Sequence, residues 1–398
     1  MDNESFSTTF ILKHHTCNEK NQAKAYSPTQ RKLRKAKLRE QEVNKQTIAS
    51  QQRKKVELIH EMHRTIRLHF PQLLEWMREV DDCRTKNSDY ELAAHLTACL
   101  AMFLFKSGSR NQYNQLREEP RFRENYERLF GFSMPHGDSV QNVMALLDQS
   151  QIEHLKHTMI LKLMERKVFH SRRYRGKWFL IAVDASGVGS YDHQRDEQCL
   201  HRTSKAGKTT YFHSVLEARL VTATGFCISI VSEWIENPEG GEYDKQDCER
   251  KGYTRIAARL KALFPRLPIL ILADGLYPYE GFFNICRANR WSYCVTLKDG
   301  NLPSVWEEAR ALQALQRQNN HREVRHRPNG TTVKQAFEWV INIDYKGHTL
   351  NWLECVETIN RQAISEEEPT PTRFVHITDL VIDVSNRHQP NGTFEMEN

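Results

Sequence analysis

Two apolar runs that each end in an aspartate constrain this chain more than any other feature of its sequence. Residues 178–184 read WFLIAVD and residues 267–274 read LPILILAD, and turn-forming residues that include glycine follow each run. A continuous apolar run bounded by turn residues is typical of a β-strand that is buried on both faces of a sheet. We therefore predict two interior strands, the first ending at Asp184 and the second at Asp274.

The position of these two aspartates indicates a possible cation site. A carboxylate at the C-terminal end of an interior strand lies at the edge where open α/β sheets bind ligands. Two carboxylates side by side need a counter-charge, because burying an unpaired carboxylate is unfavourable. Mg²⁺ or Mn²⁺, held by two or three carboxylates and by phosphate oxygens, supplies that charge in sites that cut and join nucleic-acid strands. The alternative is that each aspartate only caps the turn after its strand.

The first part of the chain differs from the rest in composition and periodicity. Residues 1–55 are polar and rich in Gln, Lys and Arg, so we predict a basic, partly disordered arm. In residues 56–172 apolar side chains recur at helical spacing, which predicts an all-helical domain. The chain has a formal net charge of +7, and much of the excess lies in the arm. This charge suits contacts with DNA phosphates, although a solvated basic face is the alternative. The residues expected to make these contacts are Arg31, Lys32, Arg34, Lys35 and Lys37.

From residue 173 the pattern changes to alternating strands and helices. After the strand that ends at Asp184 we expect a polar loop. Further strands and helices follow the loop, and the last of them form a β-rich tail. The expected elements are a hairpin of strands 209–221 and 226–234, a helix over 244–263, the strand ending at Asp274, a helix over 279–290, a strand over 291–297, a helix over 304–318, and β segments over 332–343, 348–358 and 373–380.

This order of elements predicts the fold class. Strand, hairpin, helix, strand, helix, strand is the order of a ribonuclease-H-like sheet, whose first aspartate lies on the first strand and whose second follows the crossover helix. We predict an α/β fold with a ribonuclease-H-like mixed sheet as catalytic core at residues 173–300. A β-rich insertion at 301–380 and a short remainder of the core at 381–398 would follow it.

Cysteine usage and hydropathy exclude some other classes of protein. The nine cysteines form no CxxC pair, which argues against a disulfide framework. Cys199 and His201, with His193 and His213 nearby, are of metal-ligand type, but their spacing matches no standard zinc knuckle. The sequence has no apolar signal peptide and no run of about 20 apolar residues, so no membrane partner is predicted.

Six short motifs together resemble those of bacterial insertion-sequence transposases of the DDE type, in the group whose ribonuclease-H-like core is interrupted by a β-rich insertion. The resemblance covers about residues 170–380, while the helical N-terminal part resembles the family only in general character. The motifs are residues 181–187 (IAVDASG), 201–205 (HRTSK), 208–213 (KTTYFH), 234–239 (WIENPE), 272–278 (LADGLYP) and 304–308 (SVWEE).

The resemblance implies a catalytic triad of two aspartates and one glutamate that holds two metal ions. Asp184 and Asp274 match the two aspartates. The third carboxylate is expected on a helix after the insertion, and Glu397 is the only residue that could match it. The expected preceding Arg is Thr393 here, and no following Lys remains, so the chain is predicted to be truncated at this ligand. Glu354, in the β-rich insertion, is the alternative third carboxylate.

Further residues are candidates for DNA contacts or for charge effects. Arg202, Lys205, Lys208 and His213 form a cationic group after the first aspartate, suited to phosphates, although an ordinary exposed hairpin is the alternative. Tyr277, three residues after Asp274, is a candidate for stacking on a base or sugar, with core packing as the alternative. We interpret three acidic residues, Asp244, Asp247 and Glu249, as charges that suit a helix N-terminus rather than as ligands.

We therefore predict a transposase that catalyses metal-dependent DNA cleavage and strand transfer at element ends with Mg²⁺ or Mn²⁺. The helical domain at 56–172 would bind those ends. The resemblance further implies double-stranded DNA as partner (terminal repeats and target), a homodimer in the synaptic complex, and a cytoplasmic, nucleoid-associated location. The alternative hypothesis is an inactive, truncated transposase relic that only binds DNA.

Overall fold

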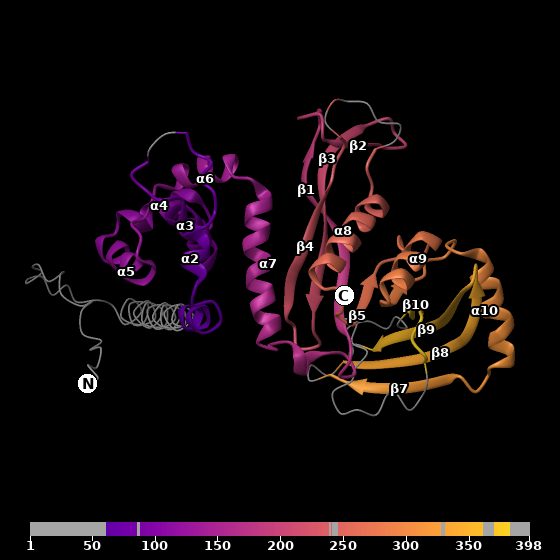
Figure 1. The fold of residues 1–398 in the computed structure, drawn as a ribbon. Coiled ribbons are helices and arrows are strands. Elements are labelled where there is room, and N and C mark those ends of the chain that lie inside the picture. Colours follow the sequence, from indigo (N-terminus) through magenta and orange to yellow (C-terminus); the bar gives the residue numbers. More distant parts are fainter. Residues whose placement is uncertain are drawn as a thin grey trace, which may run out of the picture.

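The computed structural model describes residues 61–85, 88–238, 240, 246–327, 331–360 and 370–382. In these residues a cluster of helices precedes a mixed sheet of ten strands, so the predicted α/β class is confirmed (Figure 1). The basic arm at 1–55 and residues 383–398, with Glu397, lie outside the described part of the chain.

The helices of the N-terminal part pack around a core of their own, which includes Leu96, Ala98, Tyr113 and Tyr126. Their ends follow local rules: Ser109 caps α4 by accepting from the backbone N–H of Gln112. These helices are α2 (Leu73–Arg78), α3 (Leu92–Leu104), α4 (Arg110–Glu118), α5 (Pro120–Phe130), α6 (Gly137–Leu146) and α7 (Gln149–Glu165).

Helix α7 lies between this cluster and the sheet (Figure 1). Its polar side chains bind strand β4 (Cys227–Ile235): His157 Nε2 lies 3.1 Å from the carbonyl oxygen of Ile230, and Lys156 Nζ donates to Ser229 and Ser232. Glu153, also on α7, accepts from the backbone N–H of Ser232. The helical part is therefore joined to the sheet along α7, through these polar contacts and through Ile160, which is buried in the core of the sheet.

The sheet contains every strand of the described chain in one hydrogen-bonded array. Its strand order is β2-β3-β1-β5-β6-β10-β9-β8-β7, and β4 pairs with β3. The remaining strands are β1 (Phe179–Tyr191), β2 (Leu200–Thr203), β3 (Thr209–Val221), β5 (Ile269–Ala273), β6 (Ser292–Thr296), β7 (Asn320–His326), β8 (Thr332–Tyr345), β9 (His348–Asn360) and β10 (Thr372–Thr378).

Three helices follow in the second half of the chain, and their positions agree with the sequence-based expectations except at their ends. They are α8 (Glu249–Leu263), α9 (Glu280–Asn289) and α10 (Pro303–Leu315). Helix α8 packs on β3 and β4, where Gly252 lies against Leu216 and Ile235. The apolar runs of β1 and β5 are buried beneath such packing, with Ile181 and Ile271 at most 1% exposed.

The prediction that the first strand ends at Asp184 is wrong. Strand β1 continues for seven residues to Tyr191, because β3 pairs with it antiparallel along this whole length, with Asp184 opposite Glu217. The Ala-Ser-Gly that follows Asp184 indicates a turn locally, but the structure uses it for a register shift between Gly187 and Gly189. Only the parallel pairing with β5 stops at this level, at Val183 opposite Ala273.

The β-rich tail is hydrogen-bonded to the same sheet. Strand β10 pairs antiparallel with β6 on one side and with β9 on the other. The turn predicted at Lys346 and Gly347 joins β8 to β9, and both residues have the positive φ that such a turn requires. Strands β2 and β7 were not predicted; β2 forms within the stretch after Asp184 that was expected to be a polar loop. No helix in the described ranges is long and apolar enough to cross a membrane.

Candidate functional site

Asp184 and Asp274 lie next to each other on neighbouring strands. Strands β1 and β5 run parallel, and the last printed pair of their register is Val183 opposite Ala273. Asp184 directly follows Val183, and Asp274 directly follows Ala273. Because neighbouring strands are about 4.8 Å apart, the two carboxylates leave the sheet from adjacent backbone positions. The predicted juxtaposition of the two aspartates is therefore present in the structure.

Asp274 is held by two local contacts. Its Oδ1 accepts from the backbone N–H of Leu276 at 2.8 Å, and its Oδ2 lies 2.8 Å from Nζ of Lys298. Lys298 follows β6, the next strand of the sheet, and its side chain crosses directly over Gly275, where a Cβ would collide with it. The pair is exposed on both sides, so it contributes less than about 1 kcal/mol and a competing cation can replace it.

A third carboxylate, Glu249, lies within electrostatic range of both aspartates. Burial raises the pKa of the Glu249 carboxyl, and the negative charges of Asp274 and Asp184 raise that pKa further. The hydroxyl of Tyr277 donates to Glu249 Oε2 at 3.5 Å, and the charge of Lys298 opposes the rise. Glu249 is the first residue of α8, so the packing of this helix on β3 and β4 brings it to the aspartates.

The interpretation of Glu249 as a mere helix N-terminal charge is therefore incomplete. It does occupy the first turn of α8, where a negative charge suits the helix dipole. Besides its burial, the charges of Asp274 and Asp184 act on the same carboxylate and raise its pKa. Asp247 lies just before α8, and both of its carboxylate oxygens accept from the Arg255 guanidinium. Asp244 lies outside the described part of the chain.

The carboxylate oxygens of Asp184, Asp274 and Glu249 do not all lie within 4.8 Å of one another. Within the described ranges one group of three metal-ligand side chains has all its ligand atoms within 4.8 Å, and that group is Asp196, Cys199 and His213. Like charges repel, and Lys298 holds Asp274. A divalent cation would reverse both effects, because its two charges outcompete one ammonium and attract all three carboxylates.

The cationic residues expected to contact DNA do not surround the aspartates. Arg202, Lys205 and Lys208 are exposed, on β2 and on the turn that joins it to β3. Lys208 precedes Glu217, the partner of Asp184, by nine residues, which is about 30 Å along an extended strand. These cations therefore lie well away from the carboxylates along the β2–β3 hairpin.

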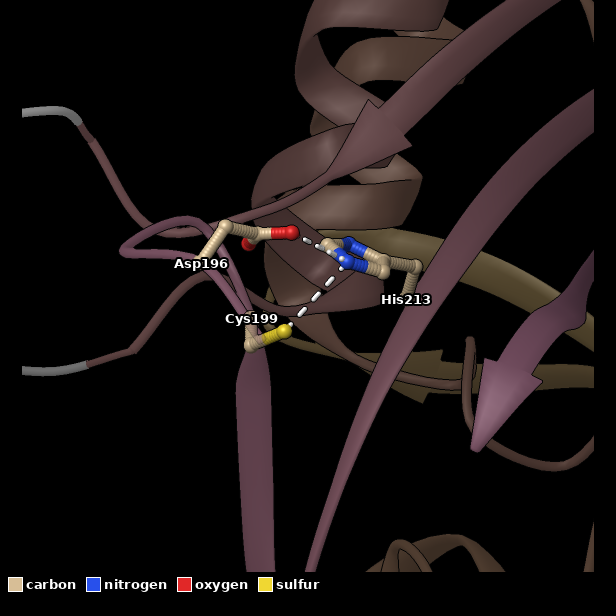
Figure 2. Close-up of side chains that lie close together, drawn as sticks. All are labelled: Asp196, Cys199 and His213. Carbon is tan, nitrogen blue, oxygen red and sulfur yellow. Dashed lines mark hydrogen bonds and ion pairs between the residues drawn. The ribbon is translucent and has the colours of Figure 1, made fainter. Parts of the chain in front are cut away.

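His213 has a different environment from these three cations. Figure 2 shows the side chains of Asp196 and Cys199 both directed at one edge of its ring. His213 Nε2 lies 3.0 Å from Asp196 Oδ2 and 3.3 Å from Cys199 Sγ. Nε2 of His213 is thus occupied by contacts within the protein, which argues against the predicted contact with a phosphate.

Tyr277 is buried in the core. It is 0% exposed, and its ring packs edge-on against Tyr253 and Phe282. A ring without exposed surface offers no face for a base, so the alternative of core packing holds. Its hydroxyl instead reaches Glu249.

Glu354 does not serve as the alternative third carboxylate. It lies on β9, which is separated from β5 by β6 and β10, a distance of at least about 14 Å at the usual strand spacing. Its carboxylate pairs with Arg373. The arm residues Arg31 to Lys37 and Glu397 lie outside the described part.

The chain matches no known protein-family model, and no curated protein matches it.

Proposed function

We propose that this chain catalyses metal-dependent cleavage and transfer of DNA strands, as an insertion-sequence transposase does, at a site formed by Asp184, Asp274 and Glu249. The observation that carries the proposal is the parallel register of β1 and β5, whose last pair, Val183 opposite Ala273, directly precedes Asp184 and Asp274. The nearby Glu249 supports it as a third oxygen donor. Carboxylate oxygens are the ligands that Mg²⁺ and Mn²⁺ prefer.

The strand arrangement around the site supports a ribonuclease-H-like core. The strand order β4-β3-β1-β5-β6 places the aspartate strands β1 and β5 at its centre. Strands β1, β5 and β6 are parallel, whereas β3 runs antiparallel to β1 and to β4. Helix α8 connects β4 to β5, as the crossover helix of the expected order does.

Each residue of the site would have its own role in phosphoryl transfer. Asp184, Asp274 and Glu249 would hold the cation. A bound divalent ion supplies Lewis-acid activation of the attacking hydroxyl and charge neutralisation at the leaving oxygen. Lys298 neutralises Asp274 in its absence and, once released, can pair with a DNA phosphate. The carboxylates act only as ligands, so no covalent bond between protein and DNA forms.

A nicking assay tests the proposal. Supercoiled plasmid is incubated with the chain and Mn²⁺, and Mn²⁺ binding is measured in parallel by electron paramagnetic resonance. Asp184→Asn and Asp274→Asn should each reduce nicking by at least about 100-fold, since removing one electrostatic contributor has this order of effect, and should weaken Mn²⁺ binding. Asp299→Asn is the matched control, because Asp299 is exposed and lies next to Lys298 in the chain.

Two results would contradict the proposal. Nicking that persists in both aspartate variants would place the chemistry elsewhere. DNA binding without any Mn²⁺ binding at Asp184 and Asp274 would favour the alternative of a relic that only binds DNA.

A further inference from the structure

We propose that Asp196, Cys199 and His213 form a second, separate metal site, selective for a borderline-soft transition ion such as Zn²⁺. Their three ligand atoms lie within 4.8 Å of one another (Figure 2). Tetrahedral zinc with the usual Zn–S, Zn–N and Zn–O lengths holds its ligand atoms roughly 3.4–3.6 Å apart. The observed separations from His213 Nε2, 3.3 Å to sulfur and 3.0 Å to oxygen, are close to these values.

The convergence on one nitrogen distinguishes a metal site from a catalytic relay. In a nucleophilic Cys-His-Asp triad the cysteine and the aspartate bind opposite nitrogens of the imidazole. Here Cys199 Sγ and Asp196 Oδ2 both approach Nε2. A single N–H can align well with only one acceptor, and an unprotonated Nε2 would face the carboxylate lone pairs. Without an ion, the Nε2–H of His213 and the thiol of Cys199 can both donate to Asp196. A cation at the point of convergence would replace these hydrogen bonds and bind all three groups.

The backbone around the cluster is fixed by groups that do not coordinate. Asp196 and Cys199 are joined in one turn, with the N–H of Cys199 directed at the carbonyl oxygen of Asp196 at 3.4 Å. The side chain of Asn237, 1% exposed, donates to the carbonyl oxygen of Cys199 at 2.8 Å. Its backbone N–H donates to the carbonyl oxygen of Gln198 at 3.0 Å. Two of the three ligands are therefore presented by a constrained turn.

The third ligand comes from a strand, so an ion would join two segments. His213 lies on β3 opposite Gly189 of β1, while Asp196 and Cys199 belong to the connection from β1 to β2. His213 also lines a pocket of about 420 Å³ with Glu236 and Trp234. Three protein ligands leave the fourth position of a tetrahedral ion for solvent, and this pocket adjoins the ligand His213.

The cluster is distinct from the carboxylate site in place and in chemistry. Gly189 follows Asp184 by five residues in β1, about 15 Å along the strand. A thiolate and an imidazole select zinc-like ions, whereas three carboxylates select Mg²⁺ or Mn²⁺. The inference is therefore independent of the proposed DNA chemistry.

Co²⁺ is the probe for the test, because a tetrahedral Co²⁺–thiolate site has a sulfur-to-cobalt charge-transfer band and visible d–d bands. The full chain, freed of metal, is titrated with Co²⁺ and then with Zn²⁺. We expect these bands to saturate at one ion per chain and to be abolished by excess Zn²⁺ but not by excess Mg²⁺. Binding should release a proton as the thiol becomes a thiolate.

Variants assign the bands to the cluster. Cys199→Ser should abolish the charge-transfer band, and His213→Gln and Asp196→Asn should weaken Co²⁺ binding by at least roughly tenfold. Cys227→Ser, at an exposed cysteine, and Asp184→Asn should leave the bands unchanged. Circular dichroism without metal shows whether each variant is folded. Absence of the bands in the wild-type chain, or their persistence in folded Cys199→Ser, would overturn the proposal.

Discussion

Lys298 and Asp274 form an ion pair across neighbouring strands, with Nζ 2.8 Å from Oδ2, at the position where a catalytic cation is proposed to bind. The lysine is thus a built-in competitor for that cation. Because 60% of the lysine side chain and 47% of the aspartate side chain are exposed, the competition is weak and measurable.

Lys298→Met should tighten Mn²⁺ binding by up to about fivefold, since an exposed pair contributes roughly 0.2–1 kcal/mol. Isothermal titration calorimetry measures the affinity. Lys346→Met is the matched control, because Lys346 forms an equally exposed pair with Glu280 away from the site. Unchanged Mn²⁺ affinity in Lys298→Met would mean that the lysine and the cation do not share Asp274.

Glu249→Gln should weaken Mn²⁺ binding and plasmid nicking by at least about tenfold, because it removes one of three anionic ligands. The pKa of Glu249 is raised, so wild-type affinity should fall as the pH is lowered toward that pKa, and the variant should lose this component. Glu354→Gln is the comparison on β9. If Glu354→Gln, still folded, lost activity while Glu249→Gln kept it, the third ligand would be misassigned.

Lys205→Gln together with Lys208→Gln should make DNA affinity less dependent on salt. Each phosphate contact contributes about 0.9 to the slope of log K against log salt, so the slope should fall by about 1.8. Replacing Lys32, Arg34, Lys35 and Lys37 with Gln tests the arm in the same fluorescence-anisotropy titration. An unchanged slope would identify the replaced group as solvated charge.

Glu153→Ala should lower the free energy of unfolding by about 2 kcal/mol, because it removes the carboxylate that Arg259 and Lys156 share, while Arg259 keeps only its pair with Glu233. The Glu153 side chain is 13% exposed and also accepts from the backbone of Ser232. Glu165→Ala, on the same helix but in an exposed pair, should cost less than about 0.5 kcal/mol. Equal costs in urea unfolding would show that the contact of α7 with β4 does not depend on Glu153.

His376 should make the protein less stable at acidic pH. Burial lowers the pKa of this β10 histidine to about 4, below its value of about 6.5 in the unfolded chain. The unfolded state therefore takes up a proton first as the pH falls, and up to about 3 kcal/mol of stability, present above pH 6.5, is lost by pH 4. His376→Gln should reduce the acid-induced loss in urea unfolding, whereas His193→Gln, at an exposed histidine, should not.

The elements predicted best from the sequence are those that depend on local patterns of residues. The apolar runs of β1 and β5 and the hairpin of β3 and β4 follow from hydrophobic pattern and from a Gly225 turn with positive φ. Strand β7 was missed because its residues, NHREVRH, are largely charged or polar. It has one pairing partner, β8, and alternates only between exposed and half-buried positions.

The errors arose where distant segments decide the outcome. The extension of β1 past Asp184 depends on β3, which begins after an intervening strand. Glu249 reaches the aspartates only because α8 packs on β3 and β4, and no spacing in the sequence reports that packing. The convergence of Asp196 and Cys199 on one nitrogen of His213 likewise requires the register of β3 with β1 and β2.

The position of β10 between β6 and β9 also has a consequence for how the protein is made in the cell. Strand β6 ends at Thr296 and its partner β10 ends at Thr378, so the ribosome must add 82 residues (378 − 296) before the pairing is complete. At about 5–20 residues per second this takes roughly 4–16 s. During that time the nascent chain carries an open strand edge, which is a template for pairing with other chains. Chaperone binding to this edge during synthesis should therefore raise the yield of correctly folded protein.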